Sequence, residues 1–284
     1  MNALSASACK DTRTDNQEFR ALFSLPPIAL SASTALATVQ TPAPKNETGD
    51  RELDAVLWLR DCIKTAHPAL IENALEAFKK IKTPAKDLER RYSDYLVRAS
   101  GGNALAAVFG GFDFANLEDL AQSSVKKKAR QDEALARFGS EKALFEMTPA
   151  ETLCKKAVRG LKRDKDWGVY DLEEAAARFA KHPELVPHTL SDCLYEQDYW
   201  DSLYWLRNIF SIYTSDADPA GRAHDDYCFA MLAKIPPRSK DEALQVYQHL
   251  EDKDGMDRNE TPDILRNLIA GGWQKVALCS RSGS

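Results

Sequence analysis

The segment from Tyr195 to Tyr213, YEQDYWDSLYWLRNIFSIY, constrains the fold of this chain more than any other stretch. It holds four of the nine tyrosines and two of the five tryptophans. At helical spacing, one stripe of the segment consists of Tyr199, Leu203, Leu206, Phe210 and Tyr213, and Trp200, Tyr204 and Ile212 widen it. A helix that is apolar nearly all round is surrounded by other elements. The segment therefore predicts the central helix of a multi-helix core.

A second interpretation of this segment is a contact surface for a partner protein, because tyrosine and tryptophan are enriched at protein interfaces. The candidate contact residues are Tyr195, Tyr199, Trp200, Tyr204 and Trp205. Burial of both tryptophans would favour the core. Exposure of either one beside Tyr204 would favour a contact surface.

Beyond residue 50, apolar residues recur at three-to-four spacing, and helix start and stop signals separate the runs. Thr83-Pro84 predicts an N-cap followed by proline at the first helical position, and Ser100-Gly-Gly102 predicts a helix end. Thr148 to Glu151, Ser239 to Glu242 and Thr261-Pro262 predict further helix starts. The expected helices span about 53–66, 68–78, 84–99, 103–109, 115–138, 148–163, 170–181, 188–213, 221–234, 239–250 and 261–270.

Strand signals are scarce, and Leu36–Thr41 and Val276–Cys279 are the short candidates. A weak repeat relates Ala136-Arg-Phe138 to Ala177-Arg-Phe179, because leucines follow both motifs at the same offsets of six and fifteen residues. Two copies suit a two-helix repeat, although stacked repeats normally need at least three units. The predicted fold class is mostly α, an irregular multi-helix domain with short helical-repeat character.

The first fifty residues are rich in Ala, Ser, Thr and Pro and hold few large apolar side chains to offset the entropy of ordering. We expect a flexible tail over 1–50 and a helical domain over 51–284, with a further boundary within 126–140. The uncharged run that follows Arg20 and extends to Ala37 resembles a secretory signal. Its preceding residues lack a positive excess, however, and Pro26-Pro27 interrupts it. A tail is the favoured interpretation and a signal peptide is the alternative.

Composition narrows the class of protein. With 38 basic and 43 acidic residues the formal net charge is −5, which argues against a uniformly basic nucleic-acid coat. The six cysteines form no CxxC pair, and a chain of this size does not need disulfides, so a reducing cytoplasm is expected. No other apolar run is long enough to span a bilayer, and no membrane partner is expected.

Residues 103–125 have the outline of a helix-turn-helix, with Gly110-Gly111 at the turn. A DNA-reading helix should offer polar or basic side chains to base edges. Acidic residues in the first turn of the second helix oppose phosphate, but the basic residues that follow it are Lys126, Lys127, Lys128 and Arg130. DNA binding through this hairpin is therefore the alternative function, beside a plain helical hairpin.

A second group of basic residues follows the polar side of the helix expected after Thr148. Its members are Lys155, Lys156, Arg159, Lys162, Arg163 and Lys165. Lys155, Arg159 and Lys162 join the nucleic-acid candidates, and the group suits either phosphate or an acidic partner protein. A solvated helix face explains the same pattern. Apart from Trp167, the group lacks interleaved aromatic residues that could stack on bases.

Histidines and carboxylates offer the one route to an enzyme. His224-Asp225 resembles the pair of the HD phosphohydrolases, which implies a metal-dependent hydrolase as a distant third function. The nucleotide cradles GxxxxGK[ST] and GxGxxG and the nucleophile elbow GxSxG are missing from the sequence. We therefore expect no catalytic residue, no metal and no cofactor.

The block from Leu88 to Phe138 resembles accessory and regulatory proteins of bacterial conjugative plasmids and integrative elements. The likeness carries no catalytic or binding residue. It implies a bacterial cytoplasmic protein concerned with plasmid maintenance, gene control or countering another element. The function we expect is a non-catalytic helical interaction or regulatory module that docks to a partner protein.

Overall fold

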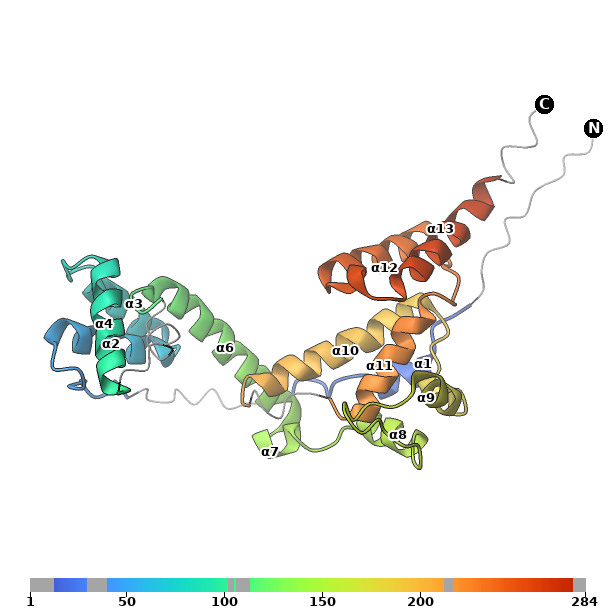
Figure 1. The fold of residues 1–284 in the computed structure, drawn as a ribbon, viewed down its shortest axis with the longest axis horizontal. Helices are drawn as coiled ribbons and strands as arrows, with labels where there is room; N and C mark the ends of the chain where they lie inside the picture. The colour runs from blue at the N-terminus through green and yellow to red at the C-terminus, as the bar shows by residue number, and fades with distance from the viewer. Residues whose placement is uncertain (1–12, 30–39, 102–104, 106–112, 212–216, 278–284) are drawn as a thin grey trace, which may run out of the picture. The chain divides into compact units, whose positions relative to one another are not determined.

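The computed structural model describes residues 13–29, 40–101, 105, 113–211 and 217–277, with side chains as far as residue 270. It is mostly helical, as the sequence predicts (Figure 1). Within these residues the β pairing amounts to one isolated bridge between Arg163 and Tyr170. None of the described helices is both long and apolar enough to cross a membrane.

The chain divides into two compact units, which we describe separately. Unit 1 comprises residues 1–27 and 137–284, and unit 2 comprises residues 28–136. The division falls inside α6 (Leu117–Phe138) and within the range 126–140 that the sequence suggested. The first helix of the expected hairpin over 103–125 lies almost wholly outside the described residues.

Unit 1 is arranged around one long helix, α10. Its elements are α1 (Gln17–Leu22), α7 (Glu141–Leu144), α8 (Pro149–Ala157), α9 (Leu172–Phe179), the 3-10 helix η1 (Pro183–Leu185), α10 (Leu190–Asn208), α11 (Pro219–Met231), α12 (Lys240–Asp252), the 3-10 helix η2 (Gly255–Asp257) and α13 (Thr261–Ala277). Helices α1, α11 and α12 pack against α10, and α11 also contacts α8 and α9 (Figure 1). Residues 195–208 of the aromatic segment thus belong to the central helix of this unit, which ends at Asn208 instead of residue 213, and Ile212 and Tyr213 lie outside the described residues.

Helix α1 departs from the expected flexible tail. Asn16 caps it, because its side chain accepts hydrogen bonds from the backbone of Glu18 and Phe19. Phe19 and Phe23 are 0% and 1% exposed. Residues 1–50 hold too few apolar side chains for a core of their own, but these two phenylalanines are buried in the core of unit 1. Most of the signal-like run after Pro27 lies outside the described residues.

Unit 2 contains α2 (Arg51–Lys64), α3 (Pro68–Phe78), α4 (Ala85–Ala99) and the first part of α6. Two apolar clusters hold it together: the first includes Leu59, Ile63 and Leu117, and the second includes Val56, Leu88 and Phe114. On its surface the Arg91 guanidinium bonds to Asp50 and Glu52, and this partner lowers the pKa of both carboxyl groups.

Most of the predicted helix starts have the expected position, but the capping hydrogen bonds differ from the expectation at some of them. Thr148 and Glu151 form the complete capping box. Ser239 caps α12, whereas the Glu242 carboxylate accepts from the Arg238 amide instead of the Ser239 amide. The Thr83 cap is wrong, because its hydroxyl donates to Glu52 at 2.9 Å and Pro84 is the N-cap residue of α4.

Two boundaries also differ from the expectation. Helix α8 ends at Ala157, whereas the expected helix ends at residue 163. Shortly after Ala157 the chain turns through Gly160, which adopts φ +86°. Val276 and Ala277 continue α13, so a strand at this position is wrong for these two residues, and residues 36–39 of the other strand candidate lie outside the described residues.

The two copies of the weak repeat have matching local structure. Phe138 and Phe179 each end a helix, a short helical segment follows, and a longer helix comes next. Leu144 and Leu185, at the same offset in the two copies, are both 0% exposed. This agreement is confined to two copies, so a helical solenoid stays a prediction.

Candidate functional site

The aromatic segment divides between core and surface. Tyr199 and Trp200 are 5% and 7% exposed, so they belong to the core and are removed from the candidate contact residues. Tyr204 and Trp205 are 36% and 48% exposed and meet edge to face, with ring centroids 5.4 Å apart. Tyr195 is half-buried, with its hydroxyl 2.7 Å from the Ser24 hydroxyl.

Tyr199 is held by a buried polar network at the start of α8. Its hydroxyl lies 2.7 Å from the Thr148 hydroxyl, and burial raises its pKa. Arg207, one of the last residues of α10, forms a bidentate ion pair with Glu151 at 2.6 and 2.9 Å. It also donates to the backbone carbonyls of Leu144 and Glu146 at 3.0 and 3.2 Å. The network joins α10 to the capped end of α8.

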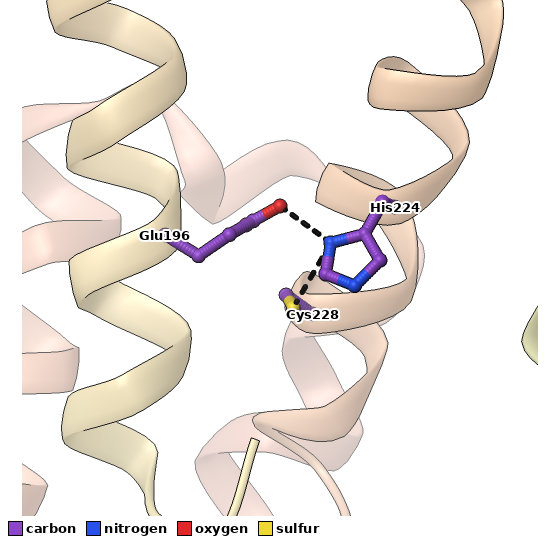
Figure 2. A group of neighbouring side chains, drawn as sticks. All are labelled: Glu196, His224 and Cys228. Carbon is purple, nitrogen blue, oxygen red and sulfur yellow. Dashed lines mark hydrogen bonds and ion pairs between the residues drawn. The ribbon is translucent and has the colours of Figure 1, made fainter. Parts of the chain in front are cut away.

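A buried cluster of metal-binding residue types lies between α10 and α11. Figure 2 shows Glu196 on α10 facing His224 and Cys228, which come from successive turns of α11. Glu196 Oε1 lies 2.7 Å from His224 Nδ1, and Cys228 Sγ lies 3.7 Å from the same nitrogen. Glu196, His224 and Cys228 are all 0% exposed.

Neighbouring groups fix the orientation of the His224 ring. Its Nε2 donates a hydrogen bond to the Leu185 carbonyl at 3.0 Å, so Nδ1 is left to face Glu196. The indole nitrogen of Trp200 donates to Glu196 Oε1, whereas Glu196 Oε2 is buried and has no hydrogen-bond partner among the described residues. Phe23 stacks on the imidazole with a centroid distance of 4.9 Å, and the ring of Phe179 meets its edge at 4.8 Å.

Asp225 lies outside this cluster. It lines a cavity of about 170 Å³ together with Gln197, Asp201, Phe229, His249, Leu250, Lys253, Gly255 and Arg258. The pKa of Asp225 is raised well above its ordinary value. Burial is the larger cause, and the nearby Glu196 carboxylate is the second. Within the described part of the chain, the one cluster suited to a metal ion contains His224 but not Asp225. The ligand set implied by the HD resemblance is therefore not assembled.

The chain after α8 forms an ordered turn from Arg163 to Tyr170, which we call the Trp167 turn. The Asp164 carboxylate accepts hydrogen bonds from the amides of Asp166 and Trp167, both at 2.9 Å. The Asp164 amide donates to the Val169 carbonyl at 2.8 Å, and Gly168 adopts φ +66°. These bonds fix the backbone of the turn, while the Trp167 side chain is 83% exposed.

Basic residues lie before this turn and within it in the sequence. The basic segment consists of six exposed residues, Lys155, Lys156, Arg159, Lys162, Arg163 and Lys165. Among the described residues, an ion pair is formed by one of the six, Lys155, with Asp218 at 3.6 Å. The segment therefore presents exposed cations, and the last of them, Lys165, lies two residues before the exposed Trp167 in the chain.

The other basic candidates belong to unit 2. Lys126, Lys127, Lys128 and Arg130 are exposed on α6. Lys128 forms an ion pair with Asp132 one turn later, so part of its charge is neutralised locally. Glu118 and Asp119 occupy the first turn of the same helix, where they stabilise the helix dipole and oppose phosphate.

Sequence reasoning missed the two features that carry most of the chemistry. The Trp167 turn falls between the helices expected at 148–163 and 170–181 and was not predicted as an ordered turn, although Asp166-Trp167-Gly168 is a turn signal. The buried cluster was missed because Glu196 and Cys228 are ordinary core positions until α10 and α11 are packed together. The i,i+4 spacing of His224 and Cys228 was the available signal.

No protein-family model, no curated protein and no solved structure matches this chain. Function is therefore argued from the chemistry of the residues themselves.

Proposed function

We propose that this protein is a non-catalytic docking module that binds an acidic partner protein through the Trp167 turn and the basic segment. The observation that carries the proposal is the 83% exposure of Trp167 at an ordered turn. Tryptophan and arginine are the residues that most often dominate the binding energy of protein interfaces. Burying the indole against a partner gains about 25 cal/mol per Å² of apolar surface.

The backbone of the turn supports this function. The Asp164 carboxylate and the Asp164–Val169 hydrogen bond hold the loop before any partner arrives. A contact loop that is already ordered loses little conformational entropy on binding. The cations of the basic segment would accelerate encounter with an acidic surface and select against basic partners.

An acidic protein fits this surface better than a nucleic acid. Non-specific nucleic-acid sites combine a basic groove with several aromatic side chains that stack on successive bases. The basic segment has one such residue, Trp167, and Asp164, Asp166 and Asp171 lie beside it in the chain. These carboxylates oppose a phosphate backbone more than they oppose a mixed protein surface. DNA binding through Lys126 to Arg130 is thus the alternative.

The cellular setting belongs to the same proposal. The resemblance of residues 88–138 supports a regulatory protein of a bacterial mobile element that acts in the cytoplasm. The four buried thiols of Cys62, Cys154, Cys193 and Cys228 are free, which agrees with a reducing compartment.

The test uses a photo-crosslinking amino acid placed at position 167 of the full chain in its native host. A cross-linked protein is then purified, and its affinity for the wild type and for Trp167→Ala is measured. We expect Trp167→Ala to weaken binding by about 10-fold or more, since hot-spot truncations cost about 2 kcal/mol. Tyr247→Ala is the matched control, because Tyr247 is also an exposed aromatic residue but lies on α12 and is not a candidate contact residue.

Equal losses from Trp167→Ala and Tyr247→Ala, or no loss from Trp167→Ala, would contradict the proposal. The DNA alternative is tested in parallel with duplex DNA at low salt. Binding that falls steeply with added salt and is lost on charge reversal of Lys126, Lys127 and Lys128 would favour that alternative instead.

A further inference from the structure

Three buried residues with metal-binding side chains meet where α10 packs on α11, and a fourth, Cys193, lies one turn away on α10. Cys193 and Glu196 lie one turn apart on α10, and His224 and Cys228 lie one turn apart on α11. All four are 0% exposed. Cys193 lies close enough to the Cys228 thiol to contribute to its raised pKa, after the larger effect of burial. The ligand atoms of Glu196, His224 and Cys228 lie within 4.8 Å of one another, whereas Cys193 lies outside this group and would reach an ion only after its side chain rotates.

The separation of Cys228 Sγ and His224 Nδ1 matches a tetrahedral zinc site. Zinc binds imidazole nitrogen at roughly 2.0–2.1 Å and thiolate sulfur at roughly 2.3 Å, which in a tetrahedron separates the two ligand atoms by roughly 3.6 Å. Cys228 Sγ and His224 Nδ1 are 3.7 Å apart. One ligand atom from each of Glu196, His224 and Cys228 lies within 4.8 Å of the others. Small side-chain rotations would open the 2.7 Å contact between Glu196 and His224 around an ion.

The surroundings of the cluster are those of a metal site. A histidine that ligates a metal normally donates its other ring N–H to a carbonyl or carboxylate, and His224 Nε2 donates to the Leu185 carbonyl. Trp200 orients the Glu196 carboxylate in the same way. The second carboxylate oxygen, Glu196 Oε2, is buried without a partner among the described residues, which is costly unless a cation or proton binds there.

We propose that Cys193, Glu196, His224 and Cys228 bind one Zn²⁺ ion that ties α10 to α11. Thiolate and imidazole ligands favour zinc over magnesium or calcium. The two cysteines bind as thiolates, and the proton shared by His224 Nδ1 and Glu196 Oε1 is also given up, so three protons leave for solvent as the ion enters. The site is closed on all sides, which makes the ion structural, since catalytic zinc keeps an open position.

A plain buried hydrogen bond between Glu196 and His224 is the competing interpretation. It explains the 2.7 Å contact, but it assigns no role to the thiols of Cys193 and Cys228 or to Glu196 Oε2. The two interpretations differ in one measurable respect, because only a metal site binds a divalent ion through thiolate.

The test is titration of the reduced, metal-stripped full chain with Co²⁺, followed by displacement with Zn²⁺. We expect one equivalent of Co²⁺ to produce the near-ultraviolet thiolate-to-cobalt absorption and the intense visible bands of tetrahedral cobalt. Cys228→Ala and Cys193→Ala should each weaken binding by more than roughly 100-fold. Cys62→Ala is the matched control, since Cys62 is equally buried but lies in unit 2.

Circular dichroism shows whether each variant is folded. If a variant unfolds, the wild type alone decides, because thiolate absorption reports ligation directly. A folded wild type that binds no Co²⁺, binds it without thiolate absorption, or binds it equally well in Cys228→Ala overturns the proposal. None of these outcomes bears on Trp167, so this inference and the docking function are tested separately.

Discussion

At the scale of single residues, Arg207 donates four hydrogen bonds from its buried side chain within unit 1. Its side chain is 5% exposed and that of its partner Glu151 is 3% exposed. A buried charge is tolerated when its partner and its remaining donors are satisfied. Arg207 meets this condition through the Glu151 carboxylate and two carbonyl oxygens, at 2.6 to 3.2 Å.

We predict that Arg207→Met destabilises the protein by about 3–5 kcal/mol, because it leaves the Glu151 carboxylate buried without its counter-charge. Urea unfolding followed by circular dichroism measures the change. Arg266→Met is the control, since Arg266 and Asp263 form an ion pair whose side chains are 76% and 66% exposed. The control should cost less than about 1 kcal/mol, and similar costs for both variants would contradict this account.

His249 gives unit 1 a dependence on pH. Burial lowers the pKa of His249 below its ordinary value of 6.5, and Lys253 lowers it further, against the opposing carboxylates of Asp198, Asp201 and Asp252. The unfolded chain therefore takes up a proton at a higher pH than the folded chain does. Its contribution to stability is complete above pH 6.5 and is lost as the pH falls through the folded pKa.

We predict that His249→Gln reduces the loss of stability between pH 7.5 and pH 5, because glutamine takes up no proton. Urea midpoints at several pH values measure the effect. Gln248→Ala, at an exposed neighbouring position on α12, is the control and should keep the wild-type pH dependence. An unchanged pH dependence in His249→Gln would show that other groups cause the loss.

At the scale of elements, helix positions follow mainly from local signals in the sequence. Proline at the first position of α3, α8 and α11, together with side-chain caps at Thr148, Thr189 and Ser239, defines where helices begin. The packing of α10 against α11 depends on a non-local detail. A Cβ atom added at Gly221 would lie 2.9 Å from Cη2 of Trp200.

We predict that Gly221→Ala destabilises the protein by about 1–3 kcal/mol, although the same change in an open helix stabilises by up to about 1 kcal/mol. The Trp200 ring cannot easily move aside, because its nitrogen bonds to Glu196 and the Phe23 ring packs edge-on against it. In a Trp200→Phe background the added methyl group has space, so the cost should fall. Thermal unfolding of the wild type, Gly221→Ala, Trp200→Phe and the double variant tests this prediction. An unchanged cost of Gly221→Ala in the Trp200→Phe background would rule out the Trp200 ring as the cause.

At the scale of the whole molecule, unit 1 is built from two stretches of chain separated by all of unit 2. The Asn16 side-chain amide donates to the Pro183 and Val186 carbonyls, and the Asn16 backbone N–H donates to the Asp192 carboxylate. All three bonds span more than 160 residues of sequence. Phe19 and Phe23 then fill the space beside His224. The N-terminal helix is thus a structural part of unit 1.

We predict that Phe23→Ala destabilises the protein by about 3–5 kcal/mol, which a flexible tail would not do. Tryptophan fluorescence follows the unfolding directly, since the Phe23 ring lies 5.9 Å from that of Trp200. Leu244→Ala, at a position 55% exposed on α12, serves as the control and should change stability by less than about 0.5 kcal/mol. If Phe23→Ala left the stability unchanged, α1 would instead be part of the flexible tail that the sequence predicts.

The sequence by itself determined the mostly helical fold, the positions of most helices and the central place of the aromatic helix. These follow from periodicity and capping, which act between residues a few positions apart. Composition also pointed to a tail before residue 50, but averaging over fifty residues concealed the burial of Phe19 and Phe23. Their partners lie on α10 and α11, and nothing in the local sequence names them.

Only the tertiary structure decided which side chains of the aromatic helix face water and which residues meet in its core. Trp200 and Trp205 are the same residue type on one helix, yet one is buried and the other is half exposed. Glu196, His224 and Cys228 come together because two helices pack at one register. The physical reason is that helix formation is local, whereas burial and metal-binding geometry arise only when segments distant in sequence pack together.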